Sequence, residues 1–451
     1  MNKLLENKIL EMKDKIVNGI LENVNIHSVK GEAQEGAPYG TGPKQALDNA
    51  IEQSEKLGLK AVNIDNKIGY TEIGEGSEMV AILGHLDVVP IGEGWTKNPL
   101  GEISNGKIYG RGTADDKGPT IASIYALKAI KDLGIPLDRR IRVIYGTDEE
   151  SGFDCVHHYI DSGQELPVAG FTPDADYPAI FAEKGGIGIT FTKKISEDDN
   201  FKILSLHGGV AKNVVTPSVE MVYRTDDRPL QRSTELEDGS YRIQFFGKSA
   251  HASTPEKGLN AFMLLCKELT LTQKTGDLFD LANFIDQKFN FEPNGKSLGV
   301  FYQDEMSGEI TLSIGLVDHT DHVLTFTLDI RYPISMDAGS CIEALKKHAE
   351  EQKMEMVVTS LTKPHYVPKD SPLIQTLMDV YREKTGDRSE PLAIGGGTYA
   401  KAFKNMVAFG IEFPGKPLLI HQADECVEID DIIKSTQISA EAIVRLANTE
   451  F

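Results

Sequence analysis

The sequence predicts an α/β fold of two domains, in which a mainly parallel sheet flanked by helices carries an inserted α+β domain. Three observations support this prediction. The chain has 451 residues, which is more than one hydrophobic core usually organises. Predicted strands and helices alternate at both ends of the chain, as is typical of a parallel sheet covered on both faces. In the middle, predicted strands follow one another as neighbours.

The N-terminal part of the α/β domain begins with a predicted amphipathic helix. Apolar residues recur at helical spacing over 2–25, and the acidic residues between them argue against a signal peptide. Two runs of Val, Ile, Leu and Ala, at 79–89 and 141–146, predict buried strands. Helical periodicity follows these runs over 119–133 and over 154–160, so strand and helix alternate.

The pattern changes in the middle of the chain. Strands are predicted at 188–194, 219–225, 241–247, 311–316, 323–331 and 356–361, and helices at 259–272, 278–288 and 341–352. Alternation then resumes with a Gly-rich turn, a strand near 407–413 and a helix from Asp430. We therefore place the inserted domain at 186–386, between the two parts of the α/β domain at 1–185 and 387–451.

Composition narrows the class of partner. The chain has 47 Lys and Arg against 68 Asp and Glu, a net charge of −21, which argues against nucleic acid or anionic lipid as the main partner. No stretch approaches the roughly 20 apolar residues of a membrane span, so we expect no membrane association. The four cysteines form no CxxC pair and predict free thiols in a reducing cytoplasm.

Histidines and carboxylates follow the predicted strands of the α/β domain. His85 and Asp87 end the first buried strand, where side chains two apart share a face. Asp115 lies in the turn GRGTADDKG before a helix, and the acids Glu149 and Glu150 follow the second strand. Taken singly, these motifs have ordinary structural explanations: a chance HxD match, helix-capping aspartates and an acidic surface turn.

Two further side chains complete this set of candidate metal ligands, and the set as a whole is a specific signal. Asp174 follows a short apolar run, and His421 follows another. Open α/β sheets bind ligands at the carboxyl ends of their strands, where all these side chains would converge. Crowded acids are unfavourable unless a cation compensates them. A mixture of imidazole and carboxylate groups suits Zn²⁺, Mn²⁺ or Co²⁺ and is unlike the thiolate sites that bind soft metals.

Seven segments occur in the order found in a known family. They are GHLDVVP, GRGTADDKGP, TDEESG, FTPDADYP, FGKSAHASTPEKGLNA, GGGTYA and IHQADE. The chain resembles the metallopeptidase family that contains aminoacylase, carboxypeptidase G, carnosinase and succinyl-diaminopimelate desuccinylase. Within that family it is similar to bacterial dipeptidases of the dipeptidase V type, and the match runs through nearly the whole chain.

The resemblance implies a centre of two divalent metal ions per chain, Zn²⁺ or Mn²⁺, with Co²⁺ as a further candidate. Asp115 would bridge the two ions. His85 and Asp174 would bind one of them, and Glu150 and His421 would bind the other. Such a pair of ions makes hydroxide available near neutral pH from a shared water.

The resemblance also implies the catalytic groups. Glu149 would be the general base that takes a proton from water and delivers it to the leaving amine. Asp87 would orient His85 by accepting its second ring N–H. His251 would supply a donor to the oxyanion. The family also has a cis peptide at the position of Asp115–Asp116.

Substrate contacts are expected in the inserted domain and the Gly-rich turn. By resemblance, Asn213, Arg331, Gly396, Gly397 and Thr398 would hold the substrate carboxylate. An Arg suits this role because its guanidinium can bind a carboxylate through two parallel hydrogen bonds. The inserted domain would be a ferredoxin-like lid of double size, because its roughly 200 residues are about twice what a single-module lid needs.

The predicted function is therefore hydrolysis of dipeptides that have a free N-terminus. One alternative is an N-acyl amino acid deacylase or desuccinylase that uses the same metal site, although a short lid would be more usual there. A remote alternative is an inactive peptide-binding protein on the same fold. We expect a monomer, with a homodimer as the alternative.

Overall fold

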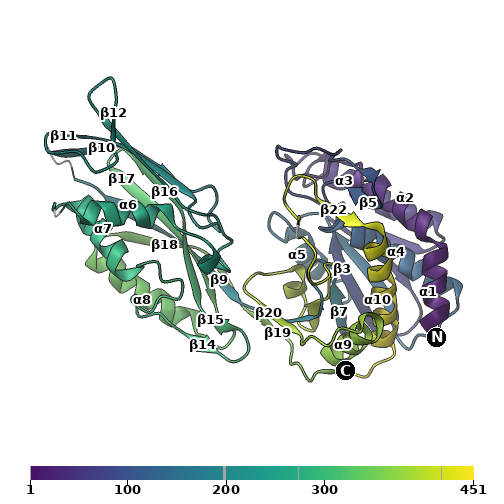
Figure 1. Cartoon of the computed structure of the whole chain (residues 1–451). Coiled ribbons are helices and arrows are strands. Elements are labelled where there is room, and N and C mark those ends of the chain that lie inside the picture. The colour runs from purple at the N-terminus through teal and green to yellow at the C-terminus, as the bar shows by residue number, and fades with distance from the viewer. Residues whose placement is uncertain (1, 197–199, 273, 418) are drawn as a thin grey trace. The chain divides into compact units, whose positions relative to one another are not determined.

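The computed structural model describes residues 2–196, 200–272, 274–417 and 419–451 (Figure 1). The chain divides into two compact units. The first comprises Met1–Phe181, Val367–Leu392 and Thr398–Phe451, and the second comprises Ala182–Tyr366 and Ala393–Gly397. The first junction lies close to the expected boundary at residue 186. The second lies earlier than residue 386, because helix α9 (Pro372–Thr385) packs against the C-terminal helix α10 (Ile429–Ala447) of the first unit.

The main sheet, most of whose strands belong to the first unit, has the order β1-β2-β6-β3-β7-β21-β8-β19, and β20 pairs with β8. Its strands are β1 (Lys60–Ile64), β2 (Ile68–Ile73), β3 (Met79–His85), β6 (Arg140–Gly146), β7 (Ala169–Thr172), β8 (Ile180–Glu183), β19 (His365–Tyr366), β20 (Leu392–Ile394) and β21 (Met406–Ala408). A smaller sheet joins β4 (Glu102–Ser104), β5 (Lys107–Tyr109) and β22 (Cys426–Glu428).

The main sheet is mixed, so the expectation of a mainly parallel sheet was wrong at its flanks. Strands β6, β3, β7 and β21 run parallel to one another. Strands β1 and β2 pair antiparallel, as do β2 with β6 and β8 with β21 and β19. A short turn joins β1 to β2, with positive φ at Asp65 and Asn66. A turn of that length permits only antiparallel pairing, whereas parallel neighbours need a long crossover.

Helices cover both faces of the parallel centre. Strand β3 is buried at every position, and its residues Met79, Ala81 and Leu83 share one core with helix α5 (Asp154–Asp161). On the other face, α4 (Lys117–Asp132) and α10 pack on β3 and against each other (Figure 1). Alternate residues of a strand point to opposite faces, which explains why a centrally placed strand is apolar throughout.

Further helices of the first unit form near the N-terminus. The single helix expected near the N-terminus is two helices, α1 (Asn2–Glu11) and α2 (Lys13–Val24), which meet at Met12. Helix α3 (Thr41–Lys56) packs on α2 and on the first two strands. In the described part of the chain, no helix is both long enough and apolar enough to span a membrane.

The second unit is an α+β structure, as expected. Its antiparallel sheet has the order β12-β13-β11-β10-β16-β17-β9-β18. The strands are β9 (Gly185–Lys194), β10 (Phe201–Gly208), β11 (Ser218–Thr225), β12 (Thr234–Glu235), β13 (Tyr241–Phe246), β16 (Thr311–Thr320), β17 (Val323–Tyr332) and β18 (Glu355–Thr362). One core joins the sheet to α6 (Ala261–Thr270), α7 (Asp277–Lys288) and α8 (Ala338–Glu351). A separate hairpin pairs β14 (Gln303–Asp304) with β15 (Gly308–Glu309).

The sequence did not predict strand β10, although β10 is central in this sheet. Its register against β11 shifts between Ile203 and Ser205. Phe201 and Ile203 are buried at a spacing of two, but the next buried residue is Leu206. A bulge of this kind breaks the alternation of apolar and polar residues by which a strand is recognised.

Candidate metal centre

The candidate metal centre lies at one edge of the main sheet. His85 is the last residue of β3, and Glu149 and Glu150 follow β6. Asp174 follows β7 on the other side of β3. Because β6, β3 and β7 are parallel neighbours, their carboxyl ends meet at the same edge, where α/β sheets place their ligands. Asp115 lies in the turn before α4 and joins them.

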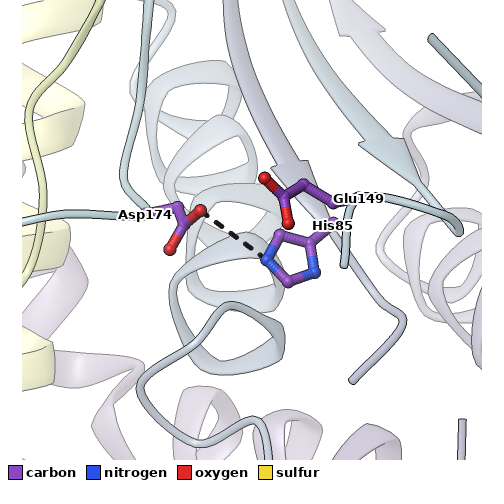
Figure 2. A group of neighbouring side chains, drawn as sticks. All are labelled: His85, Glu149 and Asp174. Atoms are coloured by element: carbon purple, nitrogen blue, oxygen red, sulfur yellow. Dashed lines mark ion pairs between the residues drawn. The ribbon is translucent and has the colours of Figure 1, made fainter. Parts of the chain in front are cut away.

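The structure brings all five expected metal ligands together. His85 Nε2 lies 3.0 Å from Asp115 Oδ1 and 3.7 Å from Asp174 Oδ2, the pair joined in Figure 2. The other carboxylate oxygen of Asp115, Oδ2, lies 3.0 Å from His421 Nε2. His421 Nε2 is also 3.1 Å from Glu150 Oε1. Asp115 thus presents one oxygen to each histidine, as a bridging carboxylate would.

Glu149 lies beside this set, and its carboxylate is turned toward the His85 ring (Figure 2). His85, Glu149 and Asp174 offer ligand atoms within 4.8 Å of one another, and so do His85, Asp115 and Glu150. The cis peptide that the family resemblance implies between Asp115 and Asp116 is present.

Asp87 orients the site differently from the expectation. His85 Nδ1 is 3.0 Å from the backbone carbonyl oxygen of Asp87 and 3.6 Å from its carboxylate. The longer distance is outside hydrogen-bonding range, so the carbonyl is the acceptor. The Asp87 carboxylate instead accepts the backbone N–H groups of Glu149, at 3.0 Å, and Glu150, at 3.1 Å. Asp87 therefore holds the histidine and the acidic turn at once.

The electrostatics of the cluster fit divalent cations. Burial raises the pKa of Glu149 to about 8, and the charge of nearby Glu150 adds to this shift. Burial and the charge of Asp115 raise the pKa of Asp174 well above its usual range. Hydrogen bonds with Asp115 and Glu150 raise the pKa of His421 to about 10. Protons therefore compensate the crowded acids in the metal-free protein, and cations bound by the same atoms would replace them.

Metal binding to the metal-free protein at pH 7 should release protons. A ligating imidazole must be neutral, whereas His421, with a pKa near 10, carries a proton at pH 7. The apparent metal affinity should consequently rise with pH up to about 10. Calorimetric titration with Mn²⁺ in buffers of different ionisation enthalpy measures the protons released.

His421→Ala should release fewer protons than the wild-type protein. His158→Ala removes an imidazole paired with Asp65 in the same unit and should release as many as the wild type. Heats of binding that do not depend on the buffer would contradict the predicted release.

The second unit brings its expected residues into one neighbourhood. The backbone N–H of Ala252, next to His251, donates to the carbonyl of Asn213 at 2.9 Å, and Val214 forms a bridge with His251. Thr311 pairs with Arg331 across β16 and β17, and its hydroxyl donates to the Ala252 carbonyl at 3.2 Å. The side chains of His251 and Asn213 are exposed.

The Gly-rich turn is divided between the two units. Gly396 and Gly397 belong to the second unit and Thr398 to the first. Thr398 is buried, and its hydroxyl caps the short 3₁₀ helix Tyr399–Ala402 by accepting the Ala400 N–H at 3.2 Å.

Arg331 is held by a neighbour that the sequence reasoning did not consider. Its Nε and Nη2 donate to the two carboxylate oxygens of Asp329 at 2.7 and 3.0 Å. Asp329 lies two residues earlier on β17, so both side chains point to the same face. Neither of these two hydrogen bonds uses Nη1 of Arg331.

Sequence reasoning also assigned no role to two buried charges beside the cluster. Arg111 and Glu425 form an ion pair at 2.6 Å, with side chains 3% and 1% exposed. Each lies inside a quoted motif, GRGTADDKGP and IHQADE. The sequence did contain a signal for this pair. One motif carries a basic residue and the other an acidic residue, and each motif also carries a proposed metal ligand.

Comparison with known proteins identifies the family. The sequence model of the peptidase family M20/M25/M40 matches residues 81–445. "Putative dipeptidase YtjP" of Bacillus subtilis (strain 168) is 37% identical over 463 aligned residues, which cover 98% of this chain and 99% of the relative. "Putative dipeptidase SH1171" of Staphylococcus haemolyticus (strain JCSC1435) is 31% identical and covers 97% of this chain and 98% of its own.

Solved structures share the fold. Human carnosine dipeptidase 1 has a TM-score of 0.63 at 16% identity, over 99% of this chain and 98% of that chain. The dipeptidase Dug1p of Saccharomyces cerevisiae has a TM-score of 0.63 at 14% identity, over 100% of both chains. Bacillus subtilis YXEP, described as a dinuclear metal binding peptidase of the M20 family, has a TM-score of 0.53 at 10% identity, over 98% and 99%.

The family predicted from the motifs is thus confirmed. The family model covers most of the chain, and relatives more than 30% identical match it from end to end. This chain belongs to the peptidase family M20/M25/M40 and is a hydrolase.

Proposed function

We propose that this protein is a metal-dependent dipeptidase that cleaves the peptide bond of dipeptides with a free N-terminus. The observation that carries the proposal is the placement of Asp115 between His85 and His421, with an acid beside each histidine. The dipeptide substrate is supported by the names of the full-length relatives. The size of the second unit, with its eight-stranded sheet, adds to that support.

The proposal assigns metal ligands residue by residue. Asp115 would be a ligand of both of two divalent ions, Zn²⁺ or Mn²⁺, with Co²⁺ as a further candidate. His85 and Asp174 would hold one ion, and Glu150 and His421 would hold the other. When bound, two such ions polarise the scissile carbonyl and make a shared water more acidic.

Glu149 acts as the general base in this proposal. It takes a proton from the attacking water and transfers it to the nitrogen of the leaving amine. A hydrogen bond from its backbone N–H to the Asp87 carboxylate holds it in the acidic turn. Cations among the acids would favour its ionised form, which is the form that accepts a proton.

Arg331 and Asn213, with Gly396, Gly397 and Thr398, are proposed to hold the substrate carboxylate. A dipeptide presents that carboxylate at a fixed distance from its scissile carbonyl, so binding it selects substrate length. Asp329 fixes the Arg331 guanidinium and leaves Nη1 to donate to substrate.

Arg331→Ala should lower kcat/KM for a dipeptide by about 10–100-fold, because a hydrogen bond to a charged group contributes about 1.5–3 kcal/mol. The same variant should affect the matching dipeptide amide much less, since the amide has no carboxylate to lose. His251→Ala should lower kcat for both substrates, because the oxyanion is common to them.

Steady-state kinetics on the acid and amide pair test this prediction. Arg224→Ala is a matched control, because Arg224 lies in the same unit in an exposed ion pair with Asp238. Equal losses on the acid and the amide would show that Arg331 does not bind the carboxylate.

A substrate panel tests the function itself. Dipeptides, tripeptides and N-acyl amino acids are assayed with Mn²⁺, Zn²⁺ and Co²⁺, and dipeptides should be turned over fastest. Faster turnover of N-acyl amino acids would favour the deacylase alternative. Absence of turnover with every metal would favour the inactive peptide-binding alternative.

We further propose a monomer that acts in the cytoplasm. The four cysteines are free thiols, and three of them are buried, which suits a reducing compartment. A solution mass near 49.5 kDa by light scattering would support the monomer, and twice that mass would favour the homodimer.

A further inference from the structure

A buried ion pair connects the two segments that carry Asp115 and His421. Arg111 Nη1 lies 2.6 Å from Glu425 Oε2, and both side chains are almost fully buried. Arg111 precedes Asp115 in the turn before α4, and Glu425 follows His421 and lies immediately before β22. Removing one member of a buried pair leaves the other charge uncompensated, so both segments depend on the pair.

Glu425 binds the turn of Asp115 directly. Its Oε1 faces three backbone N–H groups, those of Gly112 at 2.9 Å, Ala114 at 3.2 Å and Asp115 at 3.4 Å. One carboxylate oxygen of Glu425 thus accepts hydrogen bonds from the turn, while the other accepts a hydrogen bond from Arg111. Backbone donors bound to a buried carboxylate fix the local course of the chain.

Arg111 in turn forms hydrogen bonds with the segment that carries His421. Its Nη1 also donates to the carbonyl of Gln422, the residue after His421, at 3.2 Å. Its Nη2 donates to the carbonyl of Ile91 at 3.1 Å, and the guanidinium lies over the Trp95 ring at 5.3 Å. The guanidinium is therefore held on several sides and cannot readily turn away.

His421 itself lacks the support of regular secondary structure. It lies between β21 and β22, has a φ of +61°, and its side chain is 49% exposed. His85, by contrast, is fully buried at the end of a central strand. The position of His421 therefore depends on the contacts that hold its loop. Among these contacts, the buried Arg111–Glu425 pair connects the loop to the Asp115 turn.

We propose that Arg111 and Glu425 are positioning residues that set the spacing between His421 and Asp115 before metal binds. They would thereby determine the affinity of the metal ion held through His421, and the ion held through His85 would depend on them less. The inference rests on the proposed function in one respect, namely that His421 and Asp115 are metal ligands.

Titration of the metal-free protein with Mn²⁺ tests the inference without any assay of peptide hydrolysis. The wild-type protein should bind two equivalents. Glu425→Gln, which keeps the shape but loses the charge, should weaken one equivalent by about 10–100-fold, the usual effect of removing a partner behind a metal ligand. The other equivalent should be weakened much less. Arg111→Lys keeps the charge but loses the fork of donors, and should weaken the same equivalent.

Two control variants and one rescue measurement make the result specific. Glu72 forms another buried ion pair in the same unit, in which its carboxylate accepts hydrogen bonds from Arg142 at 2.6 and 2.9 Å. Glu72→Gln should lower thermal stability but leave both metal affinities unchanged. His421→Ala identifies the equivalent concerned, because it should abolish that equivalent. Saturating Mn²⁺ should restore kcat in Glu425→Gln, which a general loss of folding would not allow.

The inference is overturned if Glu425→Gln and Arg111→Lys bind both equivalents as the wild type does. It is also overturned if they weaken both equivalents equally, or if Glu72→Gln has the same effect. If His421→Ala binds two equivalents as tightly as the wild type does, the proposed metal ligands are refuted instead. The two failures are therefore distinguishable.

Discussion

Glu149→Ala is expected to lower kcat by about 10²–10⁴-fold, the usual contribution of a well-placed proton-transfer group. Glu149 lies in the cluster with His85 and Asp174 but is not one of the proposed ligands (Figure 2). Both metal ions should therefore stay bound. The measurement is kcat on a dipeptide, with metal content determined on the same preparation.

Glu165→Ala is the control for Glu149, because it removes an exposed carboxylate of the same unit that pairs with Arg140. It should leave kcat and metal content unchanged. A Glu149→Ala protein with near-wild-type kcat and full metal occupancy would exclude Glu149 as the base. Loss of one equivalent of metal would show instead that Glu149 is a ligand.

Chelation is expected to abolish turnover, and Mn²⁺, Zn²⁺ or Co²⁺ should restore it. The metal-free protein should also be less stable, because ligands that bind only the folded state stabilise it by about 2.7 kcal/mol at a hundredfold excess over Kd. Activity and Tm are measured on the chelated protein before and after each metal is added. Unchanged turnover in protein freed of metal would contradict the proposed mechanism.

Much of the first unit was predictable because its central strands are buried on both faces. Such strands are apolar throughout, and β3 and β6 were predicted to within a few residues at their carboxyl ends. His85 is the last residue of β3, and Glu149 lies in the turn after β6. Parallel neighbours share an edge, so the convergence of these side chains followed from the order of strands alone.

Other features depended on contacts that have no local pattern. Strand β10 escaped prediction because a bulge interrupts its alternation. Helix α9 has an ordinary amphipathic sequence, and only its packing against α10 assigns it to the first unit. Antiparallel edge strands of two or three residues, such as β19, are too short to show any periodicity.

The sequence by itself determined the family, the residue types of the centre and the class of metal that such ligands suit. Tertiary structure decided which atoms meet. It turned the Asp87 carboxylate toward the acidic turn and left the backbone carbonyl to His85. It placed Asp329 against Arg331, and it joined Arg111 to Glu425 across more than three hundred residues of chain. The physical reason is that spacing along a strand or helix fixes which face a side chain occupies, whereas a hydrogen bond between distant segments exists only after both have packed.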